Sequence, residues 1–208
     1  MTAMNKKALR AEIRRNRPDE ITRQHQSQQL CRHIMESALY RQARVIGGYI
    51  PLKHEADITS VLQDALQSRK MLVIPRCESA PHMTLRHIRS LSELTPGAYG
   101  IPEPPSDAEI VDPAEVDLLL VPLECIDGRG YRLGKGGGYY DCLLAGKAIT
   151  AMGCALAYQR VTEIPCDPWD VPLPACAMPE GIHFYDQAEY SKPERKYRYE
   201  SRQEETEN

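Results

Sequence analysis

The stretch that decides the fold runs from DLLLVPL (117–123) to RLGKGGGYYD (132–141). Its first part is a short apolar run, typical of a strand that is buried on both faces of a sheet. Its second part carries four glycines and leads into residues with a helical pattern, beginning at Cys142. The order of strand, glycine loop and helix predicts an α/β fold.

The segments before and after this stretch alternate between strand and helix patterns. Strands are expected over 45–50 and over 71–74, where Pro75 ends the apolar run. Between them, apolar residues follow the spacing of an amphipathic helix, with Asp57 as its N-cap. Two strands joined by a helix favour a parallel sheet. Further strands are expected over 83–88, 117–123 and 148–158, and further helices over 5–17 and from Ile21 to Met35.

The two ends of the chain differ from its centre. The first helix is strongly basic and is stopped by Pro18. We expect one α/β domain over 1–185, followed by a charged tail over 186–208 that is disordered. The segment 91–113 is a long connection rich in proline, and loops of that length in compact domains tend to be functional.

Composition and charge exclude several classes of protein. The chain of 208 residues is 42% hydrophobic and 26% charged, which is too apolar for a disordered protein. Its net charge is -3, but the charges are distributed unevenly. Residues 1–44 contain ten Lys or Arg and four acids, and residues 100–127 contain eight acids and no base. The basic segment fits nucleic acid, an anionic small ligand or a solvated helix face. No aromatic residue precedes Tyr40, which disfavours nucleic acid as a partner.

The cysteines and apolar runs indicate the compartment. Seven cysteines without a C-x-x-C spacing fit neither a disulfide framework nor a structural zinc site, so we expect reduced thiols. No apolar run is long enough to span a bilayer, and no apolar signal region follows the basic N-terminus. These features predict a cytoplasmic protein without a membrane partner.

The glycine block has the composition of an anion site. Without a Cβ, successive backbone N–H groups can turn toward one point, and a following helix adds its unpaired N–H groups. Arg132 and Lys135 are cations at a helix start, where they are unfavourable unless an anion such as phosphate is bound. The block is not a P-loop, because Lys135 precedes three of the four glycines and no Ser or Thr follows it. It is not a dinucleotide fingerprint either, because Tyr139 replaces the third glycine of G-x-G-x-x-G. A glycine-rich turn that closes a hairpin is the structural alternative.

Asp141 has two interpretations from its position alone. A carboxylate in the first turn of a helix stabilises the helix dipole. The same carboxylate next to a phosphate site can be a Mg²⁺ ligand, since Mg²⁺ takes one or two carboxylates and fills its shell with water and phosphate oxygens.

Several motifs together make the chain resemble the 5-formyltetrahydrofolate cyclo-ligase family, also called 5,10-methenyltetrahydrofolate synthetases. They cover about residues 5–180 in the family's order. The most specific is RLGKGGGYYD (132–141), and the others are KKALR (6–10), YIPLKHEADI (49–58), GIPEP (100–104), DLLLVPLECIDGRGY (117–131) and PWDVPLP (168–174).

The resemblance implies a fold and a reaction. It implies a Rossmann-like, three-layer α/β fold with a mostly parallel sheet and helices on both faces. It implies ATP as cosubstrate, Mg²⁺ as cofactor and a reduced folate as substrate. Separately from the resemblance, we expect a monomer or weak dimer. The γ-phosphoryl group of ATP moves to the formyl oxygen of 5-formyltetrahydrofolate, N10 attacks the resulting iminium phosphate, and 5,10-methenyltetrahydrofolate, ADP and phosphate result.

The resemblance also assigns roles to residues. It implies catalytic roles for Arg132, Lys135 and Tyr140, and metal binding by Asp141 and Asp170, which favours the metal interpretation of Asp141. ATP binding falls on Lys6, Arg10, Arg132, Leu133, Gly134, Lys135, Gly136, Gly137, Gly138, Tyr139 and Tyr140. Substrate binding falls on Ile50, Glu55, Lys135, Gly136, Gly137, Gly138, Tyr139 and Tyr140. Glu103 is a further pocket candidate, and Trp169 is interpreted as a packing residue.

One departure leaves a second function open. The family usually has a basic residue after the tyrosine pair and aspartate, where this chain has Cys142. If that charge holds phosphate, the chain could be a relative that binds nucleotide or folate without turnover. The short connection from Asp141 to Gly153 also leaves little room for a full helix after the glycine block.

Overall fold

The predicted strand–helix–strand unit forms the centre of the sheet. The computed structural model describes residues 5–186. In it, β1 (Val45–Gly47), α4 (Thr59–Gln67) and β2 (Met71–Cys77) follow one another, and β1 pairs with β2 in parallel. The buried face of α4 consists of Val61, Leu62 and Ala65, as the helical spacing predicts.

Eight strands form the main sheet in the order β12-β11-β10-β7-β1-β2-β3-β6. The five inner strands from β11 to β2 are parallel to one another, and both edges are antiparallel. The bounds of the remaining strands are β3 (Met83–Ile88), β6 (Ile110–Val111), β7 (Leu118–Pro122), β10 (Ala151–Cys154), β11 (Ala175–Met178) and β12 (Gly181–Phe184).

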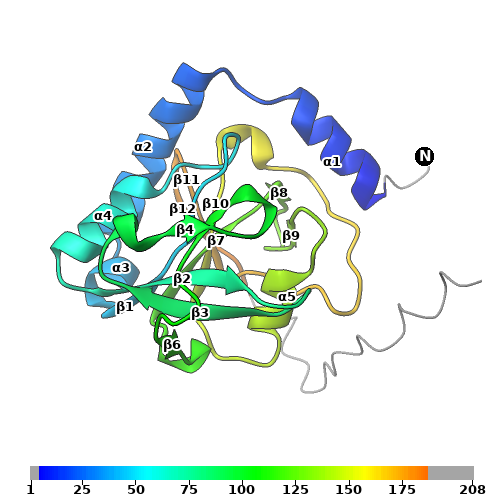
Figure 1. Cartoon of the computed structure of the whole chain (residues 1–208). Helices are drawn as coiled ribbons and strands as arrows, with labels where there is room; N and C mark the ends of the chain where they lie inside the picture. Colours follow the sequence, from blue (N-terminus) through cyan, green and yellow to red (C-terminus); the bar gives the residue numbers. More distant parts are fainter. Residues whose placement is uncertain (1–4, 187–208) are drawn as a thin grey trace, which may run out of the picture.

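The two faces of the sheet bury separate hydrophobic clusters. Along β7, Leu118 and Leu120 face the cluster shared with α2 (Glu20–Glu36), α3 (Ala38–Gln42) and α4, whereas Leu119 and Val121 face the other cluster. That second cluster includes Leu143 and Leu144 of α5 (Tyr139–Leu144). Helices α2, α3 and α4 therefore lie on one side of the sheet and α5 on the opposite side (Figure 1). This arrangement confirms the three-layer α/β prediction, although α5 is only six residues long.

The basic helix α1 (Lys6–Arg15) lies apart from the other helices (Figure 1). Its apolar residues Leu9 and Ile13 pack in a third cluster with Cys125, Tyr131, Leu133 and Ile164. Cys125 and Leu133 lie on a small hairpin formed by β8 (Cys125–Ile126) and β9 (Arg132–Leu133). Packing on this hairpin brings the basic helix next to the glycine block, which begins where β9 ends.

The proline-rich connection over 91–113 has more local structure than expected. It contains the 3₁₀ turns η1 (Leu91–Glu93) and η2 (Ala98–Gly100), a small hairpin of β4 (Thr95–Pro96) and β5 (Pro102–Glu103), and the edge strand β6. Two further 3₁₀ turns, η3 (Pro113–Glu115) and η4 (Ala157–Gln159), follow later in the chain.

Several element predictions need correction. Strand β2 continues beyond Pro75, where the sequence predicted its end. Its pairing with β1 ends at Val73, so the missing N–H group of Pro75 costs no hydrogen bond to β1. The N-cap of α4 is Ile58 rather than Asp57, whose carboxylate instead accepts a hydrogen bond from Thr59 N. The strands expected over 45–50 and 148–158 are shorter, β1 and β10, and the β8–β9 hairpin separates β7 from the glycine block.

Three further expectations concern the cysteines, membrane-spanning helices and the C-terminal tail. All seven cysteines are free thiols, and four of them are buried. Among the described residues, no helix is long and apolar enough to cross a bilayer. The boundary expected at residue 185 stays a prediction, and the expected tail lies outside the described residues apart from Asp186.

A buried carboxylate fixes the turn of the β8–β9 hairpin. The Asp127 side chain is fully buried and pairs with the Arg129 guanidinium at 2.7 Å. It also accepts backbone hydrogen bonds from Arg129 N, Tyr131 N and Ile164 N, at 2.9, 3.1 and 3.0 Å. A buried charge with this many donors is stabilising only while every bond is made. Asp127 therefore ties the hairpin to the segment at Ile164, and through the hairpin it supports the glycine block.

We predict that Asp127→Asn lowers the free energy of unfolding by about 2–4 kcal/mol, because an amide turns an N–H₂ group toward backbone donors and loses the charge. Denaturant unfolding followed by circular dichroism measures this loss. Asp107→Asn, at an exposed acid of the same charge, is the control and should unfold like wild type. Equal stability of the two variants would contradict this account of the hairpin.

Candidate active site

One cavity of about 840 Å³ lies at the carboxyl edge of the parallel strands. Residues that directly follow β1 (Tyr49 and Ile50) and β7 (Leu123 and Glu124) line it, as does Ile74 of β2. Strands β1 and β7 are neighbours from which the chain continues in opposite directions across the sheet. Such switch points of open α/β sheets are where ligands usually bind. The cavity volume lies toward the upper end of the usual range for ligand sites, about 300–1,000 Å³.

The cations expected from the sequence converge on one end of this cavity. Lys6, Arg10, Arg132 and Lys135 all line it, together with the glycine block and the acids Asp141, Asp167 and Asp170. Arg10 donates from Nε to Gly134 O at 2.8 Å, which fixes α1 to the start of the glycine block. The i, i+4 spacing of Lys6 and Arg10 places both on one face of α1. The structure thus brings the N-terminal cations and the glycine block together.

The glycine block adopts a backbone that requires glycine at two positions. Gly136 and Gly138 have φ angles of +108° and +71°, which L side chains rarely adopt. Gly138 is the N-cap of α5. Since α5 has only six residues, its dipole contributes less than the sequence led us to expect, and the loop N–H groups and side-chain cations must provide most of the positive potential.

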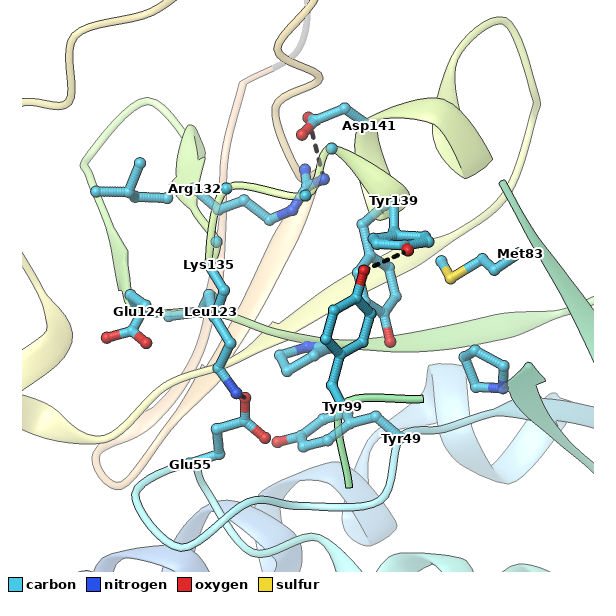
Figure 2. Close-up of a pocket in the computed structure, with 18 of the residues that line it drawn as sticks. Tyr49, Glu55, Met83, Tyr99, Leu123, Glu124, Arg132, Lys135, Tyr139 and Asp141 are labelled. Carbon is cyan, nitrogen blue, oxygen red and sulfur yellow. Dashed lines mark hydrogen bonds and ion pairs between the residues drawn. The ribbon is translucent and has the colours of Figure 1, made fainter. Parts of the chain in front are cut away.

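Lys135 and Glu55 form an ion pair across the cavity. Lys135 Nζ lies 2.7 Å from Glu55 Oε1, and Glu55 Oε2 accepts a hydrogen bond from Leu52 N at 2.9 Å. Figure 2 shows the lysine reaching from the glycine block toward the glutamate. The family resemblance implied folate binding by Glu55 and binding of both ATP and folate by Lys135, and the structure places their charged ends in contact.

The two aspartates predicted to bind metal lie on neighbouring backbone segments. Asp141 Oδ1 accepts hydrogen bonds from Arg132 at 3.0 Å (Figure 2) and from Val171 N at 3.1 Å. The second bond places Asp141 beside the peptide that follows Asp170. Carboxylates are suitable ligands for Mg²⁺, and Asp141 Oδ2 is the oxygen left for a cation. Among the described residues, no group of three or more His, Cys, Asp or Glu side chains is already arranged to hold a metal ion.

A lysine ammonium lies between two carboxylates of this region. Lys6 Nζ lies 2.7 Å from Asp167 Oδ2 and also pairs with Asp170 Oδ2. Burial acts to lower the pKa of Lys6, but the bonds to the two aspartates outweigh burial and raise its pKa above the ordinary value. Lys6 is therefore charged at neutral pH and contacts a predicted metal ligand.

The other end of the cavity is mostly apolar and aromatic. Tyr49, Ile50, Ile74, Pro75, Met83, Tyr99, Ile101 and Pro102 line it. The hydroxyl groups of Tyr99 and Tyr139 meet at 3.0 Å, and their rings pack edge to face (Figure 2). Tyr99 is 74% exposed and has a φ of +57°, an uncommon conformation for a tyrosine. This contact joins the proline-rich connection to the glycine block and closes one side of the cavity.

The tyrosines of the glycine block are neutral at physiological pH. Burial, followed by the charge of Glu55, raises the pKa of Tyr140 well above its usual value. The hydrogen bond to Tyr99 and burial raise the pKa of Tyr139 in the same direction. Both phenols can donate a hydrogen bond to an anionic or carbonyl oxygen, and neither is a general base near pH 7.

Other predicted site residues have varied surroundings. Ile50 lines the cavity and also packs against the core, and Leu133 packs against α1 while bordering the cavity. Glu103 lines the cavity, but its carboxylate is bound by Arg76 at 3.6 Å and by Cys77 N at 3.3 Å. The interpretation of Trp169 as a packing residue is wrong, because the indole is 45% exposed and lines the cavity.

The sequence reasoning missed several residues of the cavity. Asp167 has a signal in the sequence, since it precedes Asp170 by three residues in the DPWD loop. Glu124 is buried and lies 3.8 Å from both Arg14 and Arg17, so it anchors the far end of α1 and the segment after it. Tyr49 opens the motif YIPLKHEADI but was given no role, and Met83 and Tyr99 lie outside the quoted motifs, so their place in the cavity is evident only in the folded chain.

Cys142, the departure from the family pattern, is not among the residues that line the cavity. Its thiol lies 3.4 Å from His82 Nδ1. Burial raises its pKa, so the thiol is protonated at neutral pH. Position 142 is therefore not part of the cavity wall, and the charges that line the cavity come from other residues.

Comparisons with known proteins agree on one family. Residues 2–179 match the model of the 5-formyltetrahydrofolate cyclo-ligase family. The chain is 31% identical over 181 residues to the 5-formyltetrahydrofolate cyclo-ligase of Haemophilus influenzae, a match that covers 83% of this chain and 97% of that protein. It is 28% identical over 165 residues to the enzyme of the same name from Escherichia coli, covering 76% of this chain and 91% of that protein.

Solved structures support the same assignment. The structure of the 5,10-methenyltetrahydrofolate synthetase of Aquifex aeolicus superposes with a TM-score of 0.79 at 28% identity, covering 95% of this chain and all of that one. The 5,10-methenyltetrahydrofolate synthetase of Mycoplasma pneumoniae, at 22% identity and a TM-score of 0.68, shares the fold and covers 85% of this chain and 99% of that one. Because the family model matches most of the chain and the Haemophilus influenzae relative is 31% identical over almost its whole length, this chain belongs to the 5-formyltetrahydrofolate cyclo-ligase family.

Proposed function

We propose that the protein uses ATP and Mg²⁺ to convert 5-formyltetrahydrofolate to 5,10-methenyltetrahydrofolate, with release of ADP and phosphate. The observation that carries this proposal is one continuous cavity with a cationic, glycine-lined end and an apolar, aromatic end. A triphosphate needs the first environment and a pterin with an aminobenzoyl ring needs the second. The family membership supports the same reaction.

The cationic end is proposed to bind the phosphates of ATP. Lys6, Arg10, Arg132 and Lys135 supply charge, and the backbone of Leu133 to Tyr140 supplies N–H groups. Phosphoryl transfer needs positioning and charge stabilisation rather than a covalent nucleophile. Arg132 is suited to a fixed role, because its guanidinium is held by Asp141 and donates to Val171 O at 2.7 Å.

The apolar end is proposed to bind the folate, with Ile50 against one face and Glu55 at the pterin. A carboxylate can accept from the exocyclic amine and an adjacent ring N–H of a pterin in bidentate fashion. The Glu55 backbone is itself fixed, since Arg23 donates to Glu55 O at 3.2 Å. Lys135 and Tyr140 then lie where the two ligands meet.

The chemistry proposed here is the one that the family resemblance implies, and this arrangement of residues supports it. A formamide oxygen is a poor leaving group, so the γ-phosphoryl group is transferred to the formyl oxygen of the substrate, and the P–O bond to ADP breaks. N10 attacks the activated carbon and loses its proton, and the carbon–oxygen bond breaks to release phosphate. Lys135 and Arg132 neutralise charge on the transferred group, and the neutral phenol of Tyr140 donates a hydrogen bond to it.

Asp141 and Asp170 are proposed to hold Mg²⁺. Their carboxylates lie at the phosphate end of the cavity, and the bond from Val171 N brings the two residues onto adjoining segments. When bound, the metal ion neutralises developing charge on the phosphate oxygens. The carboxylates orient ligands to that ion and have no separate acid–base role in this proposal.

The setting of the reaction is also a proposal. Seven free thiols are consistent with the cytoplasm, and the small-molecule partners proposed here are ATP and a reduced folate. We propose that the protein acts as a monomer or weak dimer.

The second candidate is a relative that binds both ligands without turnover, and Cys142 was the reason to consider it. Its position outside the cavity lining weakens that reason. The test is to add ATP, Mg²⁺ and 5-formyltetrahydrofolate, and to follow methenyl-folate absorbance together with ADP release. Stoichiometric product and ADP support the enzyme, whereas binding without product supports the second candidate.

We predict that Lys135→Ala raises the KM for ATP and lowers kcat by about 10²–10³-fold, the usual effect of removing a group that stabilises transition-state charge. Steady-state kinetics with ATP varied at saturating folate measure both effects. Lys147→Ala removes an exposed lysine just after α5 and serves as the matched control. Wild-type kinetics in Lys135→Ala would refute the assignment of this lysine to the phosphates.

We predict that Glu55→Ala weakens folate binding by about 10–100-fold, because a charge-assisted hydrogen-bonding group is lost from the pterin end. Affinity for ATP should not fall, because Lys135 loses a carboxylate that competes with phosphate for its ammonium. Isothermal titration with each ligand separates the two effects, and Glu36→Ala, at an exposed acid of α2, is the control. Unchanged folate affinity would remove the folate assignment and leave the nucleotide assignment standing.

A further inference from the structure

The β4–β5 hairpin forms one wall of the apolar end of the cavity. Tyr99, Ile101 and Pro102 line the cavity from this hairpin and its turn. Two backbone hydrogen bonds close the turn, from Gly97 N to Ile101 O and from Ile101 N to Ala98 O, both at 3.0 Å. Tyr99 lies in the turn with a φ of +57°, and such a conformation persists only where the surrounding structure holds it. The wall therefore depends on whatever fixes this hairpin to the rest of the fold.

The Glu103 side chain fixes the hairpin to the end of β2, and only 5% of it is exposed. Its Oε1 accepts a hydrogen bond from Cys77 N at 3.3 Å, and its Oε2 lies 3.6 Å from Arg76 Nη1. The same Arg76 nitrogen donates to Pro104 O at 2.7 Å. Two consecutive residues of β2 thus hold Glu103 and Pro104. A buried carboxylate bound in this way is costly to remove, because its donors lose their partner away from water.

Glu103 also determines which residue fits at position 97. A Cβ atom on Gly97 would lie 2.5 Å from the carboxyl carbon of Glu103, a separation that real Cβ atoms do not show. The φ of Gly97 is −122°, which any residue adopts, so the neighbouring carboxylate rather than the backbone requires glycine here. Glu103 cannot move aside without losing its bonds to Cys77 and Arg76. The carboxylate is therefore packed directly against the start of the turn that carries Tyr99.

We propose that Glu103 is a positioning residue, which holds the β4–β5 hairpin in place as a wall for the folate. This proposal rests on the proposed function for the identity of the ligand at the apolar end. Glu103 lines the cavity, but both of its carboxylate oxygens are engaged by β2, so its role is to fix the hairpin rather than to bind the ligand. It supplies preorganisation, since a wall that is already in place needs no ordering when the ligand binds.

The first test is isothermal titration of 5-formyltetrahydrofolate and, separately, of ATP with Mg²⁺. Glu103→Ala should weaken folate binding by about tenfold, through lost preorganisation. ATP affinity should match wild type, because other contacts hold the cations of the phosphate end. In steady-state kinetics the KM for folate should rise while kcat stays nearly constant. Glu103→Gln keeps the size of the side chain and an oxygen for Cys77 N, so it should recover most of the affinity. Asp107→Ala, at an exposed acid, is the control.

Gly97→Ala tests the contact between the two residues. Alone, it should weaken folate binding as Glu103→Ala does, because the new methyl group displaces the carboxylate. Once Glu103 is alanine the methyl group has room, so the double variant Gly97→Ala/Glu103→Ala should bind folate no more weakly than Glu103→Ala. Gly128→Ala, at a glycine with open space around its Cβ position, is the matched control and should bind like wild type.

Hydrogen exchange of the ligand-free protein gives a readout that needs neither ligand nor activity. The amides of Gly97 and Ile101 should exchange about tenfold faster in Glu103→Ala than in wild type, because the hairpin opens locally. The amide of Gly48, bonded to Val73 O in the sheet, should not change and shows that the fold is intact. If wild type bound no folate, the proposed function would fail, and exchange would still decide whether Glu103 fixes the hairpin. Unchanged exchange at Gly97 and Ile101 would overturn the proposal, as would equal loss of affinity for both ligands or additive losses in the double variant.

Discussion

The site depends on charges that neutralise one another across segments distant in the sequence. Three cations that line the cavity contact carboxylates: Lys135 pairs with Glu55 and Lys6 with Asp167 and Asp170 from distant parts of the chain, whereas Arg132 pairs with Asp141 within the glycine block. Unpaired cations this close together would repel one another and lose hydration without compensation. The ion pairs let the fold gather positive charge before any phosphate is bound. Ligand binding then becomes an exchange of partners, which costs less than burying a new charge.

The scaffold explains why these pairs meet at one place. The carboxyl ends of β1 and β7 open side by side, so the segment carrying Glu55 lies opposite the segment carrying the glycine block. The β8–β9 hairpin, locked by Asp127, carries the block toward the cavity and presents an apolar surface on which α1 packs. The basic helix reaches the cavity through packing of Leu9 and Ile13 as much as through charge. Stability and ligand binding therefore share the same hairpin.

Much of this architecture could be predicted from local patterns. The βαβ unit, the inner strand at 118–122 and the basic helix follow from apolar periodicity and composition, and the glycine block from its density of glycine. The inner strand β11 and the edge strand β12 were missed because their short apolar runs lie among prolines and lack a repeating pattern. Strand β2 was predicted too short, because a proline stops a strand only where a partner requires its N–H group.

The site was predicted in outline, with its residues named through the family resemblance rather than through periodicity. Sequence reasoning could assign Lys135 and Glu55 to ligands, but it could not show that they contact each other, because that contact depends on the order of strands in the sheet. The same holds for Lys6 and Asp170, and for the tyrosine contact that closes the cavity. Such pairings depend on the three-dimensional fold, which local patterns in the sequence do not specify.

The central claim, that ligand binding exchanges the partners of these cations, is tested most directly by a crystal structure with a non-hydrolysable ATP analogue, Mg²⁺ and a folate. The account predicts that Lys135 Nζ leaves Glu55 for a phosphate oxygen, that Lys6 Nζ leaves Asp170 for another, and that Glu55 contacts the pterin. A complex in which both ligands are bound while Lys135–Glu55 and Lys6–Asp170 stay intact would contradict it.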